Sequence, residues 1–152
     1  MSPNDRYDSL FRFYAQQQGV DWLLMKAQVQ EESQFNPFAV NPTSGASGLA
    51  QFMLDTFIEW SKKLGLAYAN RFDAESSIAC QAAYMAHLLN IYVDIGKALA
   101  AYNWGMGNLY KLLLEHRDDW KDFLPIETKN YLVRVNLNYD RNYENYFKGV
   151  NK

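Results

Sequence analysis

Apolar residues recur along this chain three or four positions apart, which is the spacing of an α-helix, over almost its whole length. This pattern predicts helices over residues 5–18, 21–33, 49–64, 75–93, 96–102, 107–114 and 125–146. Asp21 is a suitable N-cap for the second helix, and Gly19 and Gly65 are expected to end the first and the third. Pro125 is expected to open the last. Alternation typical of strands is weak, so the sequence predicts an all-α fold, or an α fold with a very small β-hairpin.

One stretch departs from the helical pattern. Residues 36–48 contain two of the four prolines, Pro37 and Pro42, together with Gly45 and Gly48. Prolines and glycines at this density are typical of turns, because proline lacks a backbone donor and glycine adopts conformations that other residues avoid. We therefore expect a loop here, with at most a short extended piece.

Composition narrows the possible functions. A chain of 152 residues without a linker or an internal repeat is expected to form one domain, residues 1–152. The formal net charge is -2, and the absence of a basic stripe predicts no nucleic-acid partner. No run approaches the roughly 20 apolar residues that span a bilayer, so no membrane insertion is expected. The polar first residues lack the pattern of a secretory signal.

Cysteine and histidine offer little chemistry. Cys80 is the only cysteine, so no intrachain disulfide can form, and its apolar helical surroundings suggest a buried small side chain. His87 and His116 lie far apart in the sequence and show no metal-ligand spacing. We therefore expect no metal and no cofactor. Because no Ser/His/Asp constellation or phosphate-binding glycine loop is evident either, carboxylate chemistry is the best-motivated route.

Two adjacent acids, Glu31 and Glu32, stand at the end of the helix predicted over residues 21–33. Acids there face the negative end of the helix dipole, and such local misfits tend to gather at functional sites. If Met25 and Val29 face the core, Glu32 lies on their side, because neighbouring helical positions differ by about 100°. Its partner then turns toward solvent or the helix flank. A partly buried glutamate has a raised pKa and can donate a proton. The alternative is a surface acid pair at a frayed helix end.

Three further segments combine glycine, amide and aromatic side chains. In residues 44–53, two glycines permit close backbone approach, and Ser47 and Gln51 offer hydrogen-bonding groups near an expected helix start. Residues 101–107 end a helix at a glycine amid Tyr, Asn and Trp, and residues 125–131 are typical of a helix start. Taken singly, each segment is explained by an ordinary cap, a helix stop or aromatic packing.

Together, and in this order, the four segments resemble the motifs of the soluble lytic transglycosylase (SLT domain) family, whose fold is similar to goose-type lysozyme. The family pattern of Glu-Ser followed by Asn-Pro matches residues 32–37. Gly-Ala-x-Gly-Leu-x-Gln-x-Met matches residues 45–53, and Ala-Tyr-Asn-x-Gly matches residues 101–105. Pro-x-Glu-Thr-x-x-Tyr matches residues 125–131. The resemblance covers residues 20–140 and implies a lysozyme-like fold.

The sequence departs from the family pattern in three places. Ala50 stands where the family commonly has methionine, and residues 77–81 lack the glycine of an Asn-Ile-x-x-Gly pattern. A family serine just before the Gly-Ala pair aligns with either Asn41 or Ser44. These departures concern substrate recognition more than the type of reaction.

The resemblance implies cleavage of the β-1,4 bond between N-acetylmuramic acid and N-acetylglucosamine in the glycan strands of peptidoglycan. Glu32 would be the single general acid and base. It would protonate the glycosidic oxygen and then remove the proton of the sugar's own 6-hydroxyl, which closes a 1,6-anhydro ring. The N-acetyl group of the muramic residue would stabilise the cationic centre. Ordinary glycosidases use two carboxylates, and no second catalytic aspartate is evident in these motifs.

The resemblance also implies a set of substrate-binding residues. These are Ser44, Ser47, Gln51, Met53, Tyr102, Asn103, Glu127 and Tyr131. By that analogy Ser47 and Gln51 would bind sugar amides, and Tyr102 would orient the reacting ring. Glu127 would hold the side of the groove formed by Tyr102 and Tyr131, or would simply cap a helix.

Two alternatives use the same features. A goose-type muramidase would add water at the same bond, and a non-catalytic wall-binding module would keep the fold without the reaction. We expect a monomer that acts on the bacterial cell wall in the periplasm. It would be a phage lysin or virion-associated enzyme, or a catalytic domain excised from an envelope enzyme.

Overall fold

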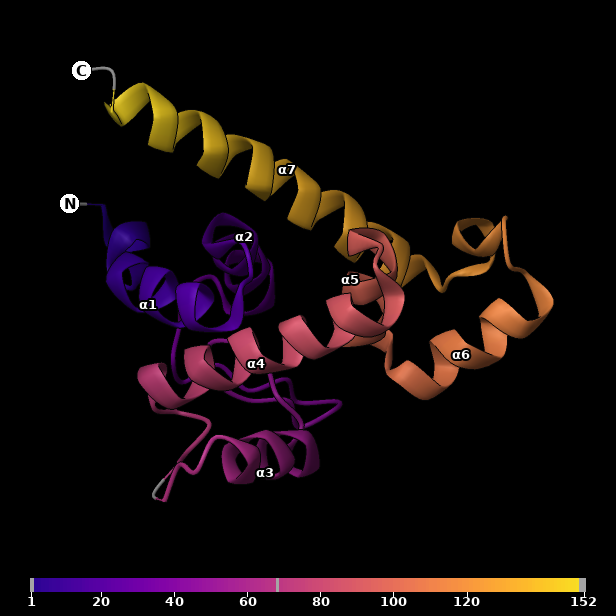
Figure 1. Cartoon of the computed structure of the whole chain (residues 1–152), viewed down its shortest axis with the longest axis horizontal. Helices are drawn as coiled ribbons and strands as arrows, with labels where there is room; N and C mark the ends of the chain where they lie inside the picture. Colours follow the sequence, from indigo (N-terminus) through magenta and orange to yellow (C-terminus); the bar gives the residue numbers. More distant parts are fainter. Residues whose placement is uncertain (1, 68, 151–152) are drawn as a thin grey trace.

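Seven α-helices and two short 3-10 helices follow one another along residues 2–67 and 69–150, which are the residues that the computed structural model describes (Figure 1). Their order is η1 (Pro3–Asp5), α1 (Asp8–Gln18), α2 (Trp22–Ser33), α3 (Leu54–Lys63), α4 (Ala74–Tyr92), α5 (Ile95–Trp104), α6 (Met106–Glu115), η2 (Trp120–Phe123) and α7 (Ile126–Val150). Within these ranges, sheet-like pairing is limited to two isolated bridges, Val40 with Ser47 and Ser47 with Phe52. The predicted all-α class is therefore confirmed.

The helices with strong capping residues begin and end close to where the sequence predicted. The Asp21 carboxylate accepts a hydrogen bond of 2.9 Å from the backbone N–H of Leu23 and so caps α2. Gly19 ends α1 in the left-handed conformation, with a φ of 71°. Pro125 directly precedes α7. The first predicted helix is wrong at its start, because Pro3–Asp5 form a separate 3-10 turn before α1.

The prediction that the third helix begins at residue 49 is also wrong. Residues 48–51 form a tight turn, and Gln51 adopts a left-handed conformation with a φ of 53°. The backbone N–H groups of Ser47 and Phe52 each donate to the carbonyl of the other, at 3.0 and 3.2 Å. The helix α3 begins only at Leu54. The buried apolar residues of the turn have the same spacing along the sequence as those of a helix, and this spacing explains why the predicted helix began too early.

The helix α4 runs through the middle of the molecule and packs against α1, α3 and α5 (Figure 1). It contributes buried side chains to all three clusters of the hydrophobic core, with Met85 in the first, Ile78 in the second and Cys80 in the third. Cys80 is a free, buried thiol, as predicted. The helix α2 packs against both α1 and α7.

Residues 2–67 and 69–150 contain neither a membrane-spanning helix nor a cluster of metal-ligating side chains. No helix there combines the length and the apolar character needed to cross a bilayer. In the same ranges, no three side chains of the His, Cys, Asp or Glu type come together as a metal site would require.

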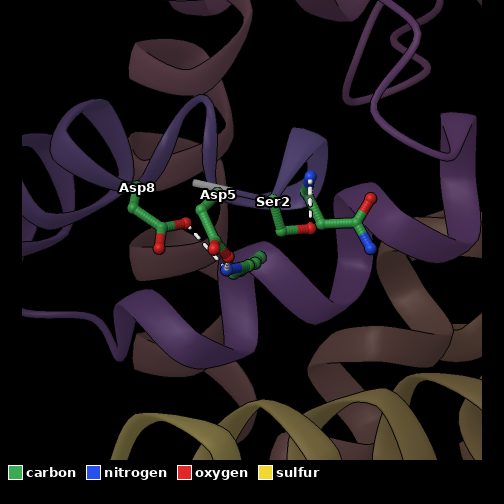
Figure 2. A network of polar contacts seen from close by, with 5 residues as sticks. Ser2, Asp5 and Asp8 are labelled. Atoms are coloured by element: carbon green, nitrogen blue, oxygen red, sulfur yellow. Dashed lines mark hydrogen bonds and ion pairs between the residues drawn. The ribbon is translucent and has the colours of Figure 1, made fainter. Parts of the chain in front are cut away.

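A buried ion pair fastens the N-terminal segment to α2. Lys26 is only 7% exposed, and its Nζ lies 2.9 Å from Oδ1 of Asp5 and 2.8 Å from Oδ1 of Asp8. Figure 2 shows the two carboxylates converging on this one amine. The hydrogen bond from Lys26 lowers the pKa of Asp5, whereas burial raises the pKa of Asp8. The lysine therefore supplies the counter-charge that two acids from η1 and α1 require.

Replacing Lys26 with methionine should destabilise the fold. The substitution keeps the apolar stem but leaves Asp8, whose side chain is 21% exposed, without its counter-ion. We expect the free energy of unfolding at pH 7, measured by urea denaturation, to fall by about 1–3 kcal/mol. The matched control is Asp5→Asn, which removes the more exposed partner and should cost less than about 1 kcal/mol. Equal stability of Lys26→Met and the parent would show that this ion pair does not fasten the segment.

Candidate active site

A cleft of about 480 Å³ opens beside the C-terminal end of α2. The loop between α2 and α3, the start of α3, the helix α4, the junction of α5 with α6 and the start of α7 form its walls. Its lining residues are Glu32, Asn41, Thr43, Ser44, Ala46, Gln51, Phe52, Met53, Thr56, Tyr84, Tyr102, Asn103, Trp104, Gly105 and Glu127. Residues of all four motifs singled out in the sequence, together with Tyr84 of α4, therefore meet at one cleft.

Seven of the nine predicted site residues lie on this cleft. They are Glu32, Ser44, Gln51, Met53, Tyr102, Asn103 and Glu127. Ser47 and Tyr131 are buried nearby and do not line it. Asn41 and Ser44, the two candidates for the family serine position, both line the cleft.

The Glu32 carboxyl is held at the point where α2 ends. The two residues that follow the last residue of α2, Gln34 and Phe35, adopt left-handed conformations with φ of 50° and 61°. The backbone therefore changes direction directly after the helix. Burial raises the pKa of Glu32 from 4.5 to about 8, and the negative charges of Glu31 and Glu127 act in the same direction. A carboxyl with this pKa is largely protonated at neutral pH and can act as an acid.

Two neighbours modify the surroundings of this carboxyl. Hydrogen bonding by the Tyr131 hydroxyl lowers the pKa of Glu32 and so opposes the effect of burial. Tyr131 is 4% exposed, so it supports the acid from behind and does not face the cleft as the sequence analysis expected. Glu31 turns to the flank of α2, where Nη1 of Arg134 on α7 lies 3.3 Å from its carboxylate. The two adjacent acids therefore have different surroundings, as their angular separation on the helix predicted.

The loop that forms one wall of the cleft is held by contacts that the sequence did not reveal. Gly48 has a φ of 84°, and a Cβ atom at this position would lie 1.8 Å from the carbonyl oxygen of Arg71. Nη1 of Arg71 in turn donates to the carbonyls of Gly45 and Phe52, at 3.1 Å each. Only glycine fits this close approach. The segment between α3 and α4 therefore fixes the loop from outside.

The Ser47 side chain forms a hydrogen bond within the loop and does not line the cleft. Its side chain is 2% exposed, and its hydroxyl donates to the carbonyl of Gly45 at 2.9 Å. The sequence predicts an exposed helix start at this position, where a serine commonly offers a free hydroxyl. That expectation failed because the residues that follow form a buried turn and not a helix.

Two amide side chains present opposite hydrogen-bonding groups to the cleft. Nε2 of Gln51 donates to the carbonyls of Ala39 and Gly48, at 3.1 and 2.9 Å, which leaves Oε1 as an acceptor. The hydroxyl of Thr128 donates to Oδ1 of Asn103 at 3.0 Å, which leaves Nδ2 as a donor. Thr128 is 2% exposed, so this orientation is set from within the protein.

Tyr102 joins two walls of the cleft. Its hydroxyl donates to the backbone carbonyl of Ala50 at 2.9 Å, so it ties α5 to the loop 52 residues earlier. Its ring packs against those of Phe52 and Tyr84, with centroids 5.9 and 5.4 Å apart. Burial, together with the charge of Glu32, holds the pKa of Tyr102 well above its usual range. This tyrosine therefore stays neutral and can orient groups beside the acid.

Sequence reasoning missed several residues of the cleft. Tyr84 and Trp104 contribute rings, and Thr43 and Thr56 contribute hydroxyls. Tyr84 stands in a long apolar helix, where an aromatic residue looks like any other core residue. Trp104 lies inside a recognised motif, at a position where the family pattern allows any residue, so no signal marked it.

Comparisons with known proteins give a consistent result. Residues 9–122 match the family model described as "Transglycosylase SLT domain". The chain is 35% identical, over 91% of its length, to membrane-bound lytic murein transglycosylase F of Marinobacter nauticus. The identity and coverage are the same for membrane-bound lytic murein transglycosylase F 1 of Alkalilimnicola ehrlichii. The chain spans 30% of the length of each of these two relatives.

Two solved structures are similar as well. The 70 kDa soluble lytic transglycosylase of Escherichia coli superposes with a TM-score of 0.81 and 28% identity, covering 95% of this chain and 25% of that one. The lytic transglycosylase Slt of Pseudomonas aeruginosa gives a TM-score of 0.79 and 27% identity, covering 89% of this chain and 23% of that one. The latter structure is of an inactive mutant in which one glutamate is replaced by glutamine.

The raised pKa of Glu32 should make stability depend on pH. Between its ordinary pKa of 4.5 and about 8, the folded protein holds a proton that the unfolded chain releases. The free energy of unfolding therefore falls as the pH rises through this window. Glu32→Gln removes the carboxyl, so we expect the variant to exceed the parent at pH 8 by on the order of 2 kcal/mol, and to match it near pH 4.

Urea denaturation of both proteins at pH 4 and pH 8 measures this difference. Glu144→Gln is the matched control, because Glu144 is paired with Lys148 on the exposed far part of α7 and is not among the charges that raise the pKa of Glu32, so its loss should bring no gain at pH 8. A stability difference between Glu32→Gln and the parent that is the same at both pH values would contradict a raised pKa.

Proposed function

Because the chain belongs to the transglycosylase SLT domain family, we propose that it is a peptidoglycan lytic transglycosylase domain. It cleaves the β-1,4 bond between N-acetylmuramic acid and N-acetylglucosamine and leaves a 1,6-anhydro end. The observation that carries this proposal is the position of Glu32, a carboxyl with a pKa of about 8 on the wall of a polar cleft. The inactive glutamate-to-glutamine mutant among the similar structures supports a glutamate as the essential group.

Glu32 performs two proton transfers in this scheme. In the protonated form it donates its proton to the glycosidic oxygen, and the bond from that oxygen to the anomeric carbon breaks. The carboxylate that remains accepts the proton of the 6-hydroxyl, whose oxygen then bonds to the same carbon. Glu32 ends protonated, as it began, so no water is consumed. A pKa near the working pH suits both steps, because neither protonation state is strongly disfavoured.

The surroundings of Glu32 match these two steps. Burial and the negative charge of Glu127 favour the protonated form before the first transfer. The hydrogen bond from Tyr131 stabilises the carboxylate that exists between the two transfers. Glu127 is exposed at the start of α7 and acts on Glu32 through its charge, and the scheme uses Glu32 as its single acid and base.

The cleft offers hydrogen bonds and ring faces suited to amino sugars. The Gln51 acceptor suits an acetamido N–H, and the Asn103 donor suits an acetamido carbonyl or a sugar hydroxyl. The rings of Tyr84 and Trp104 supply apolar faces on which pyranose rings can stack. Met53, 49% exposed, forms part of the wall.

No lysine, arginine or histidine is among the described residues that line the cleft. Recognition by neutral groups is what a glycan backbone requires, because its acetamido and hydroxyl groups carry no charge. Ser44 and Asn41 extend the polar side of the same wall. These contacts favour a carbohydrate over a peptide or a nucleic acid as the main occupant.

The biological setting follows the substrate. The named relatives are murein transglycosylases, which supports the bacterial cell wall as the place of action. The route by which this domain reaches the wall, whether as a phage lysin, a virion-associated enzyme or part of an envelope enzyme, stays a prediction. So does the expectation of a monomer with no nucleic-acid partner.

Glu32→Gln should abolish lysis of purified sacculi. Glutamine keeps the shape of the side chain but cannot give or take the proton, and loss of a general acid commonly lowers the rate by about two to four orders of magnitude. The turbidity of a sacculus suspension measures the rate, and mass spectrometry of the products identifies the ends. Anhydro ends are expected. Reducing ends would favour the muramidase alternative, and unchanged lysis by the variant would remove Glu32 from the mechanism.

Thr128→Val should slow lysis with little loss of stability. Valine fills the same space but cannot hold Oδ1 of Asn103, so the Nδ2 donor is no longer directed into the cleft. A hydrogen bond of ordinary strength corresponds to a rate decrease of roughly 3- to 10-fold. The melting temperature serves as the control. A large decrease in melting temperature with an unchanged rate for the remaining folded protein would mean that Thr128 only supports packing.

A further inference from the structure

Two glutamine side chains lie fully buried behind Glu32. Gln28 is on α2, one turn before Glu32, and Gln81 is on α4, and both are 0% exposed. Burying an amide costs free energy unless hydrogen bonds replace those made to water. An apolar side chain of similar volume would avoid this cost. Two such residues beside the candidate acid therefore need an explanation other than packing.

The two amides belong to a chain of hydrogen bonds that ends at Glu32. Nε2 of Gln81 donates to the backbone carbonyl of Met25 at 3.0 Å and to Oε1 of Gln28 at 3.2 Å. Nε2 of Gln28 donates to the hydroxyl oxygen of Tyr131 at 3.4 Å. The Tyr131 hydroxyl is in turn the hydrogen-bonding group that lowers the pKa of Glu32. The chain thus connects α4, α2 and α7 with the acid.

The direction of this chain is set at its inner end. The Met25 carbonyl can only accept, so Gln81 must turn its NH2 group toward α2. Gln28 then presents its oxygen to Gln81 and its NH2 group to Tyr131. Because an NH2 group only donates, the oxygen of Tyr131 accepts there, and its proton is directed at Glu32.

This arrangement leaves one buried hydrogen-bond acceptor unsatisfied. Oε1 of Gln81 is buried and has no hydrogen-bond partner among the described residues. Turning the amide over would bring that oxygen against the Met25 carbonyl and the oxygen of Gln28, which are both acceptors. An unsatisfied buried acceptor is unfavourable for folding. The observed orientation therefore satisfies the Met25 carbonyl and the oxygen of Gln28 and leaves this one acceptor unsatisfied.

We infer that Gln28, oriented by Gln81, is a positioning residue for Glu32. By donating to Tyr131, Gln28 fixes the tyrosine hydroxyl as a donor to the carboxyl and polarises it. The carboxylate that Glu32 becomes after the first proton transfer is thereby stabilised and held in one orientation. Gln28 is buried and touches no substrate, so it acts only through Tyr131. Its part in catalysis rests on the proposed function, whereas the hydrogen-bond chain does not.

The other groups around Glu32 are independent of this chain. Glu31 and Glu127 act through their negative charges and favour the protonated acid. Tyr102 faces the same carboxyl as a neutral phenol, and its hydroxyl donates to a backbone carbonyl. Substituting Gln28 leaves all three in place. A change in the titration of Glu32 after that substitution therefore reports on the chain alone.

The test is the titration of the Glu32 carboxyl in Gln28→Met. Carbon-13 NMR of protein labelled at the glutamate carboxyl follows it, and the resonance is assigned by its loss in Glu32→Gln. Methionine keeps the length of the side chain but cannot donate, so we expect the pKa of Glu32 to rise by about half a unit. Tyr131→Phe should raise it by about one unit. The double variant should match Tyr131→Phe, because Gln28 acts only through that hydroxyl.

The matched control is Ile78→Val. Ile78 is fully buried on α4, one turn from Gln81, so this variant perturbs core packing without touching the chain and should leave the titration unchanged. Two results would overturn the inference. One is a Gln28→Met protein that titrates like the parent. The other is a shift that persists undiminished in the Tyr131→Phe background.

Lysis of sacculi separates this inference from the proposed function. If the parent lyses sacculi, the alkaline limb of its pH profile should move upward in Gln28→Met by the same amount as the NMR titration. A parent without lytic activity but with the expected titration shifts would refute the proposed function and leave the hydrogen-bond chain standing. An active parent with no shift in Gln28→Met would refute the inference alone.

Discussion

Burial of a single carboxyl is the constraint on which the site depends. Glu32 stands where α2 ends and lines the cleft, so the negative end of the helix dipole faces it, and burial withdraws much of its carboxyl from water. These effects favour the protonated acid. The hydrogen bond from Tyr131 favours the carboxylate, and the balance places the pKa at about 8. A group poised in this way can give a proton and take one back without a second acid.

The remainder of the site keeps the partners of this carboxyl fixed before any substrate arrives. The Tyr102 hydroxyl is hydrogen-bonded to the loop between α2 and α3, and Thr128 orients the side chain of Asn103. Arg71 donates hydrogen bonds to the same loop from the segment between α3 and α4. All three contacts lie within the protein and need no ligand. Groups that are already oriented lose little freedom when a substrate binds, so more of the binding energy is available for the reaction.

Structural features that depend on neighbouring residues were predictable from the sequence. Features that depend on contacts between residues far apart in the sequence were not. The cap at Asp21 and the helical position of Glu32 depend on a few neighbouring residues, and the structure agrees with both. The turn around Gln51 depends on contacts with Arg71, twenty residues later, so its pattern was mistaken for a helix. Ser47 and Tyr131 were placed by residue type, but burial, which a single sequence does not reveal, decides what they contact.

Both ends of the described chain emerge on the same side of the molecule (Figure 1). The first residue of the cleft on α7, Glu127, lies at the other end of a 25-residue helix, which is about 37 Å long. Neighbouring modules joined at either end would therefore attach away from the end of α7 that reaches the cleft. On the proposed function, this geometry allows the domain to be joined to anchoring or targeting domains of different shapes while a polymer strand still enters the cleft.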